Sequence, residues 1–403
     1  MDENRPLLSL PVLLIYGVVF AAQCSRTMFV VIVSWFALSI EGRVASVGQL
    51  LVWWPLLSLF LGPIMGVAVD HFNRRNLLIV GEGIRIAGVM WLALKIQAGS
   101  VDLITLRETA IIVYFGALIS IPSSQGLLQV VGGHSLARIS TGAVSVNLAA
   151  EVVGAGAVGV ALATVGTLGS LMICITFSVI AVAFVTKFHH AGAVPPRRTG
   201  ATHLTDLIEG FRIVIYDRQL SMTCLALTFG WAAAQITLAL LAGFTRFELR
   251  LGPDAYGWID SMWGVGGVVG GIALLYFSRT AINVKFMRLS LPLLAAATAG
   301  FSLAQSFWAA LLLQALMGVA FAINLAVCDA HILNAVDASA IGRVRNNLQA
   351  AAGAVGVLVF LSPSLYGDAS IRAVYFGFSI ILASVAAILV IGNHDGQSGG
   401  WDR

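Results

Sequence analysis

The sequence predicts an all-α membrane protein with twelve transmembrane helices, and three observations lead to this prediction. Of the 403 residues, 59% are hydrophobic and only 10% are charged, whereas about a quarter of the residues of an ordinary soluble domain are charged. Apolar runs of about 20 residues, the length that crosses a bilayer as a helix, recur along nearly the whole chain. One long polar stretch separates two sets of six such runs. The short alternating segments of a β-barrel are not seen.

Glycine, proline and charged residues mark the breaks between the apolar runs. The first run follows a short polar N-terminus and is too long for the core of a cleaved signal peptide, so we expect it to be a retained span. The predicted spans are 10–39, 46–69, 77–96, 109–131, 140–163, 168–186, 219–244, 256–277, 287–304, 307–330, 346–363 and 371–392.

The basic residues predict the orientation of the chain. If both termini are cytoplasmic, most Lys and Arg residues fall in cytoplasmic segments, as the positive-inside rule requires. We therefore expect a multi-pass protein of the cell's inner membrane with both termini in the cytoplasm. The basic residues are dispersed among the loops and form no patch for nucleic acid.

The polar stretch predicts the domain organisation: an N-terminal six-helix bundle at 1–186, a linker at 187–218 and a C-terminal six-helix bundle at 219–403. Within the linker, residues 204–216 carry apolar side chains on one helical side, which favours a helix lying along the cytoplasmic interface over a site for a regulatory partner.

The two halves also resemble each other. Leu-Ala-Arg-Ile at 136–139 and Ile-Gly-Arg-Val at 341–344 both precede a span that is rich in small residues. Duplication of a six-span unit is a common construction of secondary transporters.

The loop between the second and third spans carries a family resemblance. Gly66 is followed four residues later by Asp70 and then by the basic pair Arg74 and Arg75. This pattern, at this place in the chain, resembles the signature loop of the major facilitator superfamily. The resemblance implies two six-helix bundles and a conformational latch formed by these four residues.

Other segments resemble the branch of that superfamily that contains macrolide, multidrug and siderophore exporters. They are Leu207–Arg212, Leu136–Arg138 and Tyr256–Trp258. Two features depart from the pattern: the second-half counterpart of the signature loop, at 271–280, lacks an acidic residue, and the glycine-rich segment 154–159 lacks the expected proline. The resemblance to this branch implies export.

Charged residues inside the predicted spans are the candidate functional groups, because each costs about 2.5–3.5 kcal/mol at the centre of a bilayer. The resemblance implies that spans 1, 4, 7 and 10 line a central cavity beside spans 2, 5, 8 and 11. In that arrangement the cavity can be reached by Arg26, Glu151, Asp260 and Asp329. Glu82 and Arg85 cannot reach it, and their spacing of three predicts that they pair with each other or with the latch.

Three acids are candidates for proton coupling. Glu151, surrounded by Gly, Ala and Val, is the first choice because a buried carboxyl group can cycle between its charged and neutral forms; its alternative is a permanent ion pair with Arg26. The alternative for Asp260 is a role in the outer vestibule. Asp329, with His331 nearby, fits an interfacial position equally well.

The candidate substrate-binding residues are Arg26 with Gln23 on the same helix face, and Phe229, Trp231 and Gln235 in the seventh span. The guanidinium of Arg26 suits an anionic group of a substrate, or it neutralises an acid such as Glu151. The aromatic side chains suit a flat or amphipathic solute.

No catalytic constellation, phosphate-binding loop or metal-ligand cluster is found in the sequence, so an enzyme is not expected and no cofactor is predicted. The predicted function is a secondary active transporter that works by alternating access, coupled to protons, and that exports a small organic solute such as a drug or siderophore. We expect a monomer whose partners are the substrate, protons and the bilayer. The alternatives are an importer or uniporter of an anionic metabolite and, from another class, a lipid flippase or a non-transporting membrane receptor.

Overall fold

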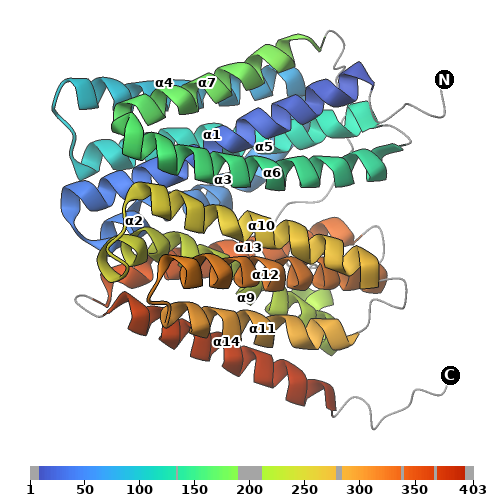
Figure 1. Cartoon of the computed structure of the whole chain (residues 1–403). Coiled ribbons are helices and arrows are strands. Elements are labelled where there is room, and N and C mark those ends of the chain that lie inside the picture. Colours follow the sequence, from blue (N-terminus) through green and yellow to red (C-terminus); the bar gives the residue numbers. More distant parts are fainter. Residues whose placement is uncertain are drawn as a thin grey trace. The chain divides into compact units, whose positions relative to one another are not determined.

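The computed structural model describes residues 9–132, 135–188, 211–277, 284–336, 340–366 and 370–394, and within these ranges the chain is helical apart from short connections (Figure 1). The helices are α1 (Leu10–Glu41), α2 (Val44–Leu51), α3 (Trp53–His71), α4 (Arg74–Gln97), α5 (Leu103–Gly132), α6 (Leu136–Thr164), α7 (Gly166–Thr186), α9 (Arg218–Gly243), α10 (Pro253–Phe277), α11 (Val284–Ser302), α12 (Phe307–Ala335), α13 (Ile341–Leu361) and α14 (Ile371–His394), with short turns η2 (Phe244–Glu248) and η4 (Ser362–Ser364).

Every predicted span coincides with helical structure, and the second one differs from its prediction by a break. Residues 46–69 were expected to form one helix, and α2 and α3 are separated by the single residue Val52, which keeps helical backbone angles and donates to the Gly48 oxygen at 2.9 Å. Pro55 explains the break, because it has no N–H to donate to the carbonyl of Leu51. Apart from the helical residues 211–216, thirteen α-helices are therefore observed in the described ranges, where twelve spans were expected.

Ten helical segments in the described ranges have the length and composition to cross a membrane. The predicted eighth and ninth spans correspond to α10 and α11, which do not meet those criteria over their described residues. In α10 the glycines and Asp260 lower the mean hydropathy, and of α11 only Leu289–Ser302 enters this comparison. Multi-pass membrane insertion is thus supported, while the count of twelve spans is not established.

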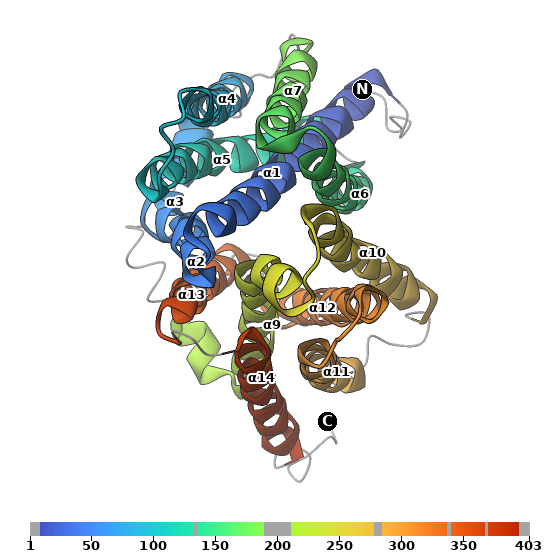
Figure 2. The ribbon, with the colours of Figure 1, turned by 60° about the vertical axis from the view of Figure 1, so that its left-hand side comes forward.

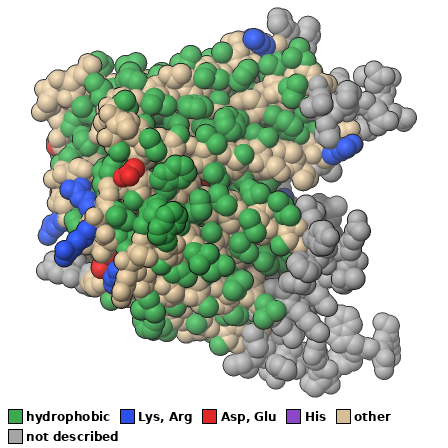
Figure 3. Space-filling model, in the orientation of Figure 1, with side chains coloured by type: hydrophobic (Ala, Val, Ile, Leu, Met, Phe, Trp, Pro, Cys, Tyr) green, Lys and Arg blue, Asp and Glu red, His purple; other side chains and the backbone are tan. Residues whose placement is uncertain are grey.

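Large apolar side chains are exposed on the flanks of the helices, as a bilayer requires. Phe60 is 69% exposed, Ile272 is 60% exposed and Leu358 is 70% exposed. Hydrophobic side chains cover most of the visible face in Figure 3, and the Lys and Arg side chains seen there lie near the helix ends. Exposing so large an apolar surface to water would be unfavourable, so the helix flanks face lipid.

The chain divides into two compact units. Unit 1 comprises Met1–Arg198 with Leu251–Ser261, and unit 2 comprises Thr199–Arg250 with Met262–Arg403. The first part of α10 therefore belongs to unit 1 and its remainder to unit 2. Of the predicted linker helix at 204–216, only residues 211–216 are described, and they are helical; the remainder lies outside the described residues.

In unit 1, α1 is the central helix. It contacts α2, α5, α6 and α7, and α4 packs against α5 and α7 (Figure 2). The contact of α4 with α5 is close because glycines meet: a Cβ added to Gly81 would lie 2.8 Å from the carbonyl oxygen of Gly116. Backbones that approach this closely form a rigid pair.

In unit 2, α9 contacts α11, α12, α13 and α14, and α11 packs against α12 and α14. At the end of α9 the rings of Phe244, Phe301 and Tyr375 form a cluster with centroid separations of 4.9–5.6 Å. Arg372 lies over the Phe244 ring and forms a 2.8 Å ion pair with Glu248. These contacts join α9, α11 and α14 at one end of the unit.

Candidate functional site

Arg26 and Gln23 lie on the least covered side of α1. Ala22, Cys24, Ser25, Met28 and Phe29 are buried, whereas Gln23, Arg26, Thr27 and Val30 are partly exposed. The spacing of three and four places these four side chains along one helix face. The helices packed around α1 cover its other faces, and the arginine is therefore only partly buried although it lies in the middle of a 32-residue apolar helix.

The Arg26 guanidinium is held by an uncharged partner. Its Nε donates to Oε1 of Gln23 at 2.8 Å, and a second guanidinium nitrogen donates to the same oxygen. No direct ion pair to Arg26 is found among the described residues. Its positive charge is thus oriented but not neutralised by contact, and it is available to an anionic group.

Glu151 is carried by α6, which packs closely on α1. The Cys24 thiol donates to the carbonyl oxygen of Ala150 at 3.3 Å, and a Cβ added to Gly154 would lie 3.1 Å from the carbonyl oxygen of Cys24. Glu151 is partly exposed, and within the described part of the chain no group donates a hydrogen bond to its carboxylate. It interacts electrostatically with Arg26 without a direct ion pair. The permanent pair that was the alternative prediction is therefore not observed.

The first turns of α10 complete this region of unit 1. Gly257 packs on Gly159 of α6, where an added Cβ would lie 2.6 Å from the Gly159 Cα. The neighbouring Tyr256 stacks on Trp35 of α1, with ring centroids 6.0 Å apart. Asp260 follows one turn later, is partly exposed, and interacts electrostatically with Glu151. Three predicted site residues, Arg26, Glu151 and Asp260, are thus brought together on α1, α6 and α10.

Sequence reasoning did not connect the residues that bring these charges together. Gly159 and Gly257 are far apart in the sequence, and so are Trp35 and Tyr256. Their only sequence signal is composition: small residues in facing helices and an aromatic residue near each helix end.

In unit 2 the aromatic candidate Trp231 contacts other aromatic rings. Its ring lies 5.2 Å from that of Phe321 in an edge-to-face arrangement, and Trp263 lies 5.4 Å from Phe321 on another side. Trp231 remains 39% exposed. Phe229 is two residues away on α9, about 200° around the helix axis, so it points to a different side and does not join this cluster.

Gln235 faces α13. Its Nε2 donates to the carbonyl oxygen of Ala352 at 3.4 Å, and its buried Oε1 has no hydrogen-bond partner among the described residues. An added Cβ on Gly356 would lie 2.7 Å from the Gln235 amide, so this glycine makes room for the side chain. Gln235 is consequently a polar group in the packed interior of unit 2, and its role in substrate binding stays a prediction.

Asp329 pairs with Arg345 across α12 and α13. The closest nitrogen and oxygen are 3.5 Å apart, and the two side chains are 39% and 47% exposed. A pair this exposed contributes little stability, about 0–1 kcal/mol. The role of Asp329 in proton coupling stays a prediction.

The arginines of the predicted latch bind backbone carbonyl groups of unit 1. Arg74 donates to the Gly126 oxygen at 2.8 Å, and Arg75 donates to the Val185 and Thr186 oxygens at 3.3 and 2.9 Å. These hydrogen bonds connect the start of α4 to α5 and to the C-terminal end of α7. Gly66 and Asp70 lie in α3, and their side-chain surroundings are outside the described residues.

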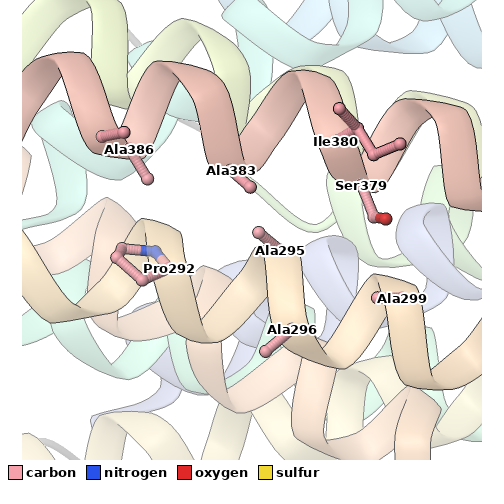
Figure 4. A pocket seen from close by; sticks show the side chains of 9 residues that line it. Pro292, Ala295, Ala296, Ala299, Ser379, Ile380, Ala383 and Ala386 are labelled. Carbon is pink, nitrogen blue, oxygen red and sulfur yellow. The ribbon is translucent and has the colours of Figure 1, made fainter.

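A cavity of about 520 Å³ lies apart from all of these residues, between α11 and α14 (Figure 4). Ser379 is its one polar lining residue, and the Ser379 hydroxyl donates to the carbonyl oxygen of Phe376 in its own helix. The remaining lining is Pro292, Ala295, Ala296, Ala299, Ile380, Ala383, Ala386 and Ala387. With no free polar group, this cavity does not resemble a site for a polar substrate.

No known family's sequence profile matches the chain, and no curated protein matches it in sequence. Solved structures do match. The nucleoside transporter NupG, in a mutant form, is similar with a TM-score of 0.78 and 14% identity over 94% of this chain and 99% of that one. The POT family transporter PepTSo has a TM-score of 0.76 and 11% identity over 98% of this chain and 100% of that one. A bacterial homologue of the human lysosomal transporter Spinster, inward-facing and unoccupied, has a TM-score of 0.67 and 14% identity over 96% of both chains.

All three similar structures are membrane transporters and none is an enzyme. At identities this low the likeness concerns the fold. This chain therefore shares the fold of these three transporters.

Proposed function

We propose that this protein is a secondary transporter of the inner membrane, with twelve spans in two six-helix bundles, the linker at 187–218 and both termini in the cytoplasm. Alternating access would move a small organic solute across the bilayer. The shared fold and the ten membrane-length helices support a transporter. The resemblance to exporters supports outward movement.

Proton coupling by Glu151 is the central part of the proposal. The observation that carries it is the isolation of this carboxylate: it is partly exposed, it lies in an apolar helix, and no described residue holds it by a hydrogen bond or a direct ion pair. A carboxylate in such a position can gain and lose a proton without breaking a structural contact. Asp260, which interacts electrostatically with Glu151, is the second acid of the proposed site.

The test compares wild-type protein with Glu151→Gln in proteoliposomes. The transported compound is sought among organic cations, beginning with ethidium, and organic anions, beginning with succinate. Glutamine has nearly the size of glutamate but cannot release a proton, so the variant should exchange the compound across the membrane yet fail to accumulate it against an imposed pH gradient. Unchanged gradient-driven accumulation would remove Glu151 from this role.

A second candidate function is transport of an anionic metabolite, inward or by uniport. It is favoured by the charge of Arg26, which is oriented by Gln23 and not neutralised by a direct contact among the described residues. Wild-type protein should then bind succinate in preference to ethidium, and Arg26→Ala should abolish that preference. Equal binding of succinate by the variant would exclude Arg26 as the anchor.

A further inference from the structure

Four buried side chains of unit 1 form a closed ring of hydrogen bonds, which we name the Ser25–Arg85 ring. Its members are Ser25 of α1, Glu82 and Arg85 of α4, and Ser178 of α7. The side chains of Glu82 and Arg85 are each 1% exposed, and Ser25 and Ser178 are 1% and 2% exposed. The predicted pairing of Glu82 with Arg85 is confirmed, with Nη1 of Arg85 at 2.7 and 2.6 Å from the two carboxylate oxygens.

The direction of every hydrogen bond in the ring follows from the donors available. Nη2 of Arg85 donates to the Ser25 hydroxyl at 3.1 Å, and the Ser178 hydroxyl donates to Oε2 of Glu82 at 3.0 Å. Because Ser178 has a single proton, its 2.8 Å contact with Ser25 must be donated by Ser25. Within the ring each hydroxyl thus donates once and accepts once, and both carboxylate oxygens of Glu82 accept; the Ser25 hydroxyl also lies 3.4 Å from the Cys174 sulfur.

The ring fixes the rotation of α1. It holds the Ser25 side of the helix against α4 and α7, and Nη1 of Arg85 also lies 3.5 Å from the carbonyl oxygen of Ala22. The Cys174 thiol adds a contact to the Ser25 carbonyl oxygen at 3.3 Å. The next residue, Arg26, projects about 100° further around the axis. Holding Ser25 inward therefore turns Arg26 and Gln23 to the partly exposed face.

A glycine of α5 leaves the space that the Arg85 side chain occupies. A Cβ added to Gly116 would lie 2.7 Å from Cγ of Arg85, so the stem of this arginine occupies space that a larger residue would take. The opposite charges of Arg85 and Glu82 act on Arg26 in opposite senses. The ring consequently holds α1 in place beside Arg26.

We propose that Ser25, Glu82, Arg85 and Ser178 are positioning residues, which set the direction in which Arg26 and Gln23 point. The importance of that direction for transport rests on the proposed function. The orientation itself does not, and it can be measured without a substrate.

The experiment uses Ser178→Ala, with Ser170→Ala as the matched control. Both serines are buried in α7, but the Ser170 hydroxyl donates to Gly166 of its own helix and is not part of the ring. Each substitution is combined with Gln23→Cys, and the protein in lipid nanodiscs is treated with a water-soluble maleimide. Mass spectrometry then separates label at position 23 from label on the native, fully buried Cys24, which lies on another side of α1.

The ratio of the two labelling rates reports the rotation of α1. We expect position 23 to react much faster than Cys24 in the parent and in the Ser170→Ala variant. In the Ser178→Ala variant the ratio should fall about fivefold, the change that corresponds to loss of a hydrogen bond worth about 1 kcal/mol. The melting temperature of each variant shows that the folded protein is being labelled.

A ratio that stays within about twofold of the parent in Ser178→Ala, when the protein is folded, would overturn the proposal, because a hydrogen bond of ordinary strength would then have no effect on orientation. The proposed function fails separately: if Arg26→Ala transports normally while Ser178→Ala lowers the ratio, the ring orients α1 but Arg26 is not part of the transport site.

Discussion

Gly159 in α6 and Gly257 in α10 lie against each other with no side chain between their backbones. A Cβ added to Gly159 would lie 2.7 Å from the Cα of Gly257 and 2.8 Å from the carbonyl oxygen of Pro253. A backbone cannot move aside as a flexible side chain can. This contact brings Asp260 toward Glu151, so the acids of the proposed site depend on it.

We therefore expect Gly159→Ala to destabilise the protein by about 1–3 kcal/mol, the usual cost of adding a methyl group to a packed interior. Gly156→Ala is the matched control one turn away, since its added Cβ would lie no closer than 3.6 Å to any neighbour. Alanine is favoured over glycine in a helix by about 0.5–1 kcal/mol, so the control should be neutral or stabilised. Unfolding in detergent micelles measures both, and equal effects would refute the close contact.

The pair of Glu82 and Arg85 predicts a strongly non-additive mutant cycle. Glu82→Gln leaves a fully buried guanidinium without its counter-charge, which should cost about 3–5 kcal/mol of unfolding free energy. Replacing both residues with glutamine removes both charges, and it should cost less than Glu82→Gln alone. If the double variant is instead destabilised by the sum of the single effects, the two charges do not depend on each other.

The hydrogen bonds of Asp102 predict that the stability of the first turn of α5 depends on pH in the acidic range. The backbone N–H and the hydroxyl of Thr105 donate to its carboxylate at 2.8 and 2.7 Å and hold the pKa of Asp102 below its ordinary value of 3.8. A lowered pKa in the folded state stabilises the fold above pH 3.8, and this contribution is lost as the pH falls through the folded-state pKa.

Asp102→Ala should accordingly increase backbone hydrogen exchange in the first turn of α5 at neutral pH, and it should remove the acid-induced increase expected in wild type. Asp102→Asn keeps an acceptor and serves as the control, with a smaller effect at neutral pH. An increase in exchange below pH 3.8 that is the same in wild type and Asp102→Ala would show that this carboxylate does not cap the helix.

The contacts of Arg372 predict that the protein is less stable with lysine than with arginine at this position. It donates from Nε to Glu248 at 2.8 Å and from Nη1 to the carbonyl oxygen of Ser302 at 2.9 Å, and it covers the ring of Phe244. Lysine keeps the charge but cannot make these contacts together, so Arg372→Lys should cost about 1–2 kcal/mol.

Arg345→Lys is the control, because Arg345 makes one long, exposed contact with Asp329, and a change within about 0.5 kcal/mol is expected there. Similar losses for both substitutions, measured by thermal unfolding at equal salt, would contradict the role of the planar guanidinium.

The helices of this fold could be predicted from the sequence, because apolar runs of membrane length are a local signal. The pairing of Glu82 with Arg85 was predictable for the same reason, since a spacing of three fixes their common face. The break at Val52 was missed because the apolar run continues through it, although Pro55 marks it chemically.

Contacts between distant segments could not be predicted. Ser25 and Ser178 are ordinary serines in apolar helices until the fold places both beside Glu82 and Arg85. Arg26, Glu151 and Asp260 could be selected individually by the cost of a charge in a membrane span, but their grouping depends on glycine contacts between helices that the chain brings together only when folded.

The role of Glu151 is tested most directly by measuring, in proteoliposomes of wild type and Glu151→Gln, both exchange and gradient-driven accumulation of one transported compound. Exchange requires no net proton movement, whereas accumulation requires release of the coupled proton. The account predicts that the variant exchanges the compound but does not accumulate it when a pH gradient is imposed. Accumulation at the wild-type rate and to the wild-type level would contradict proton coupling by this carboxylate.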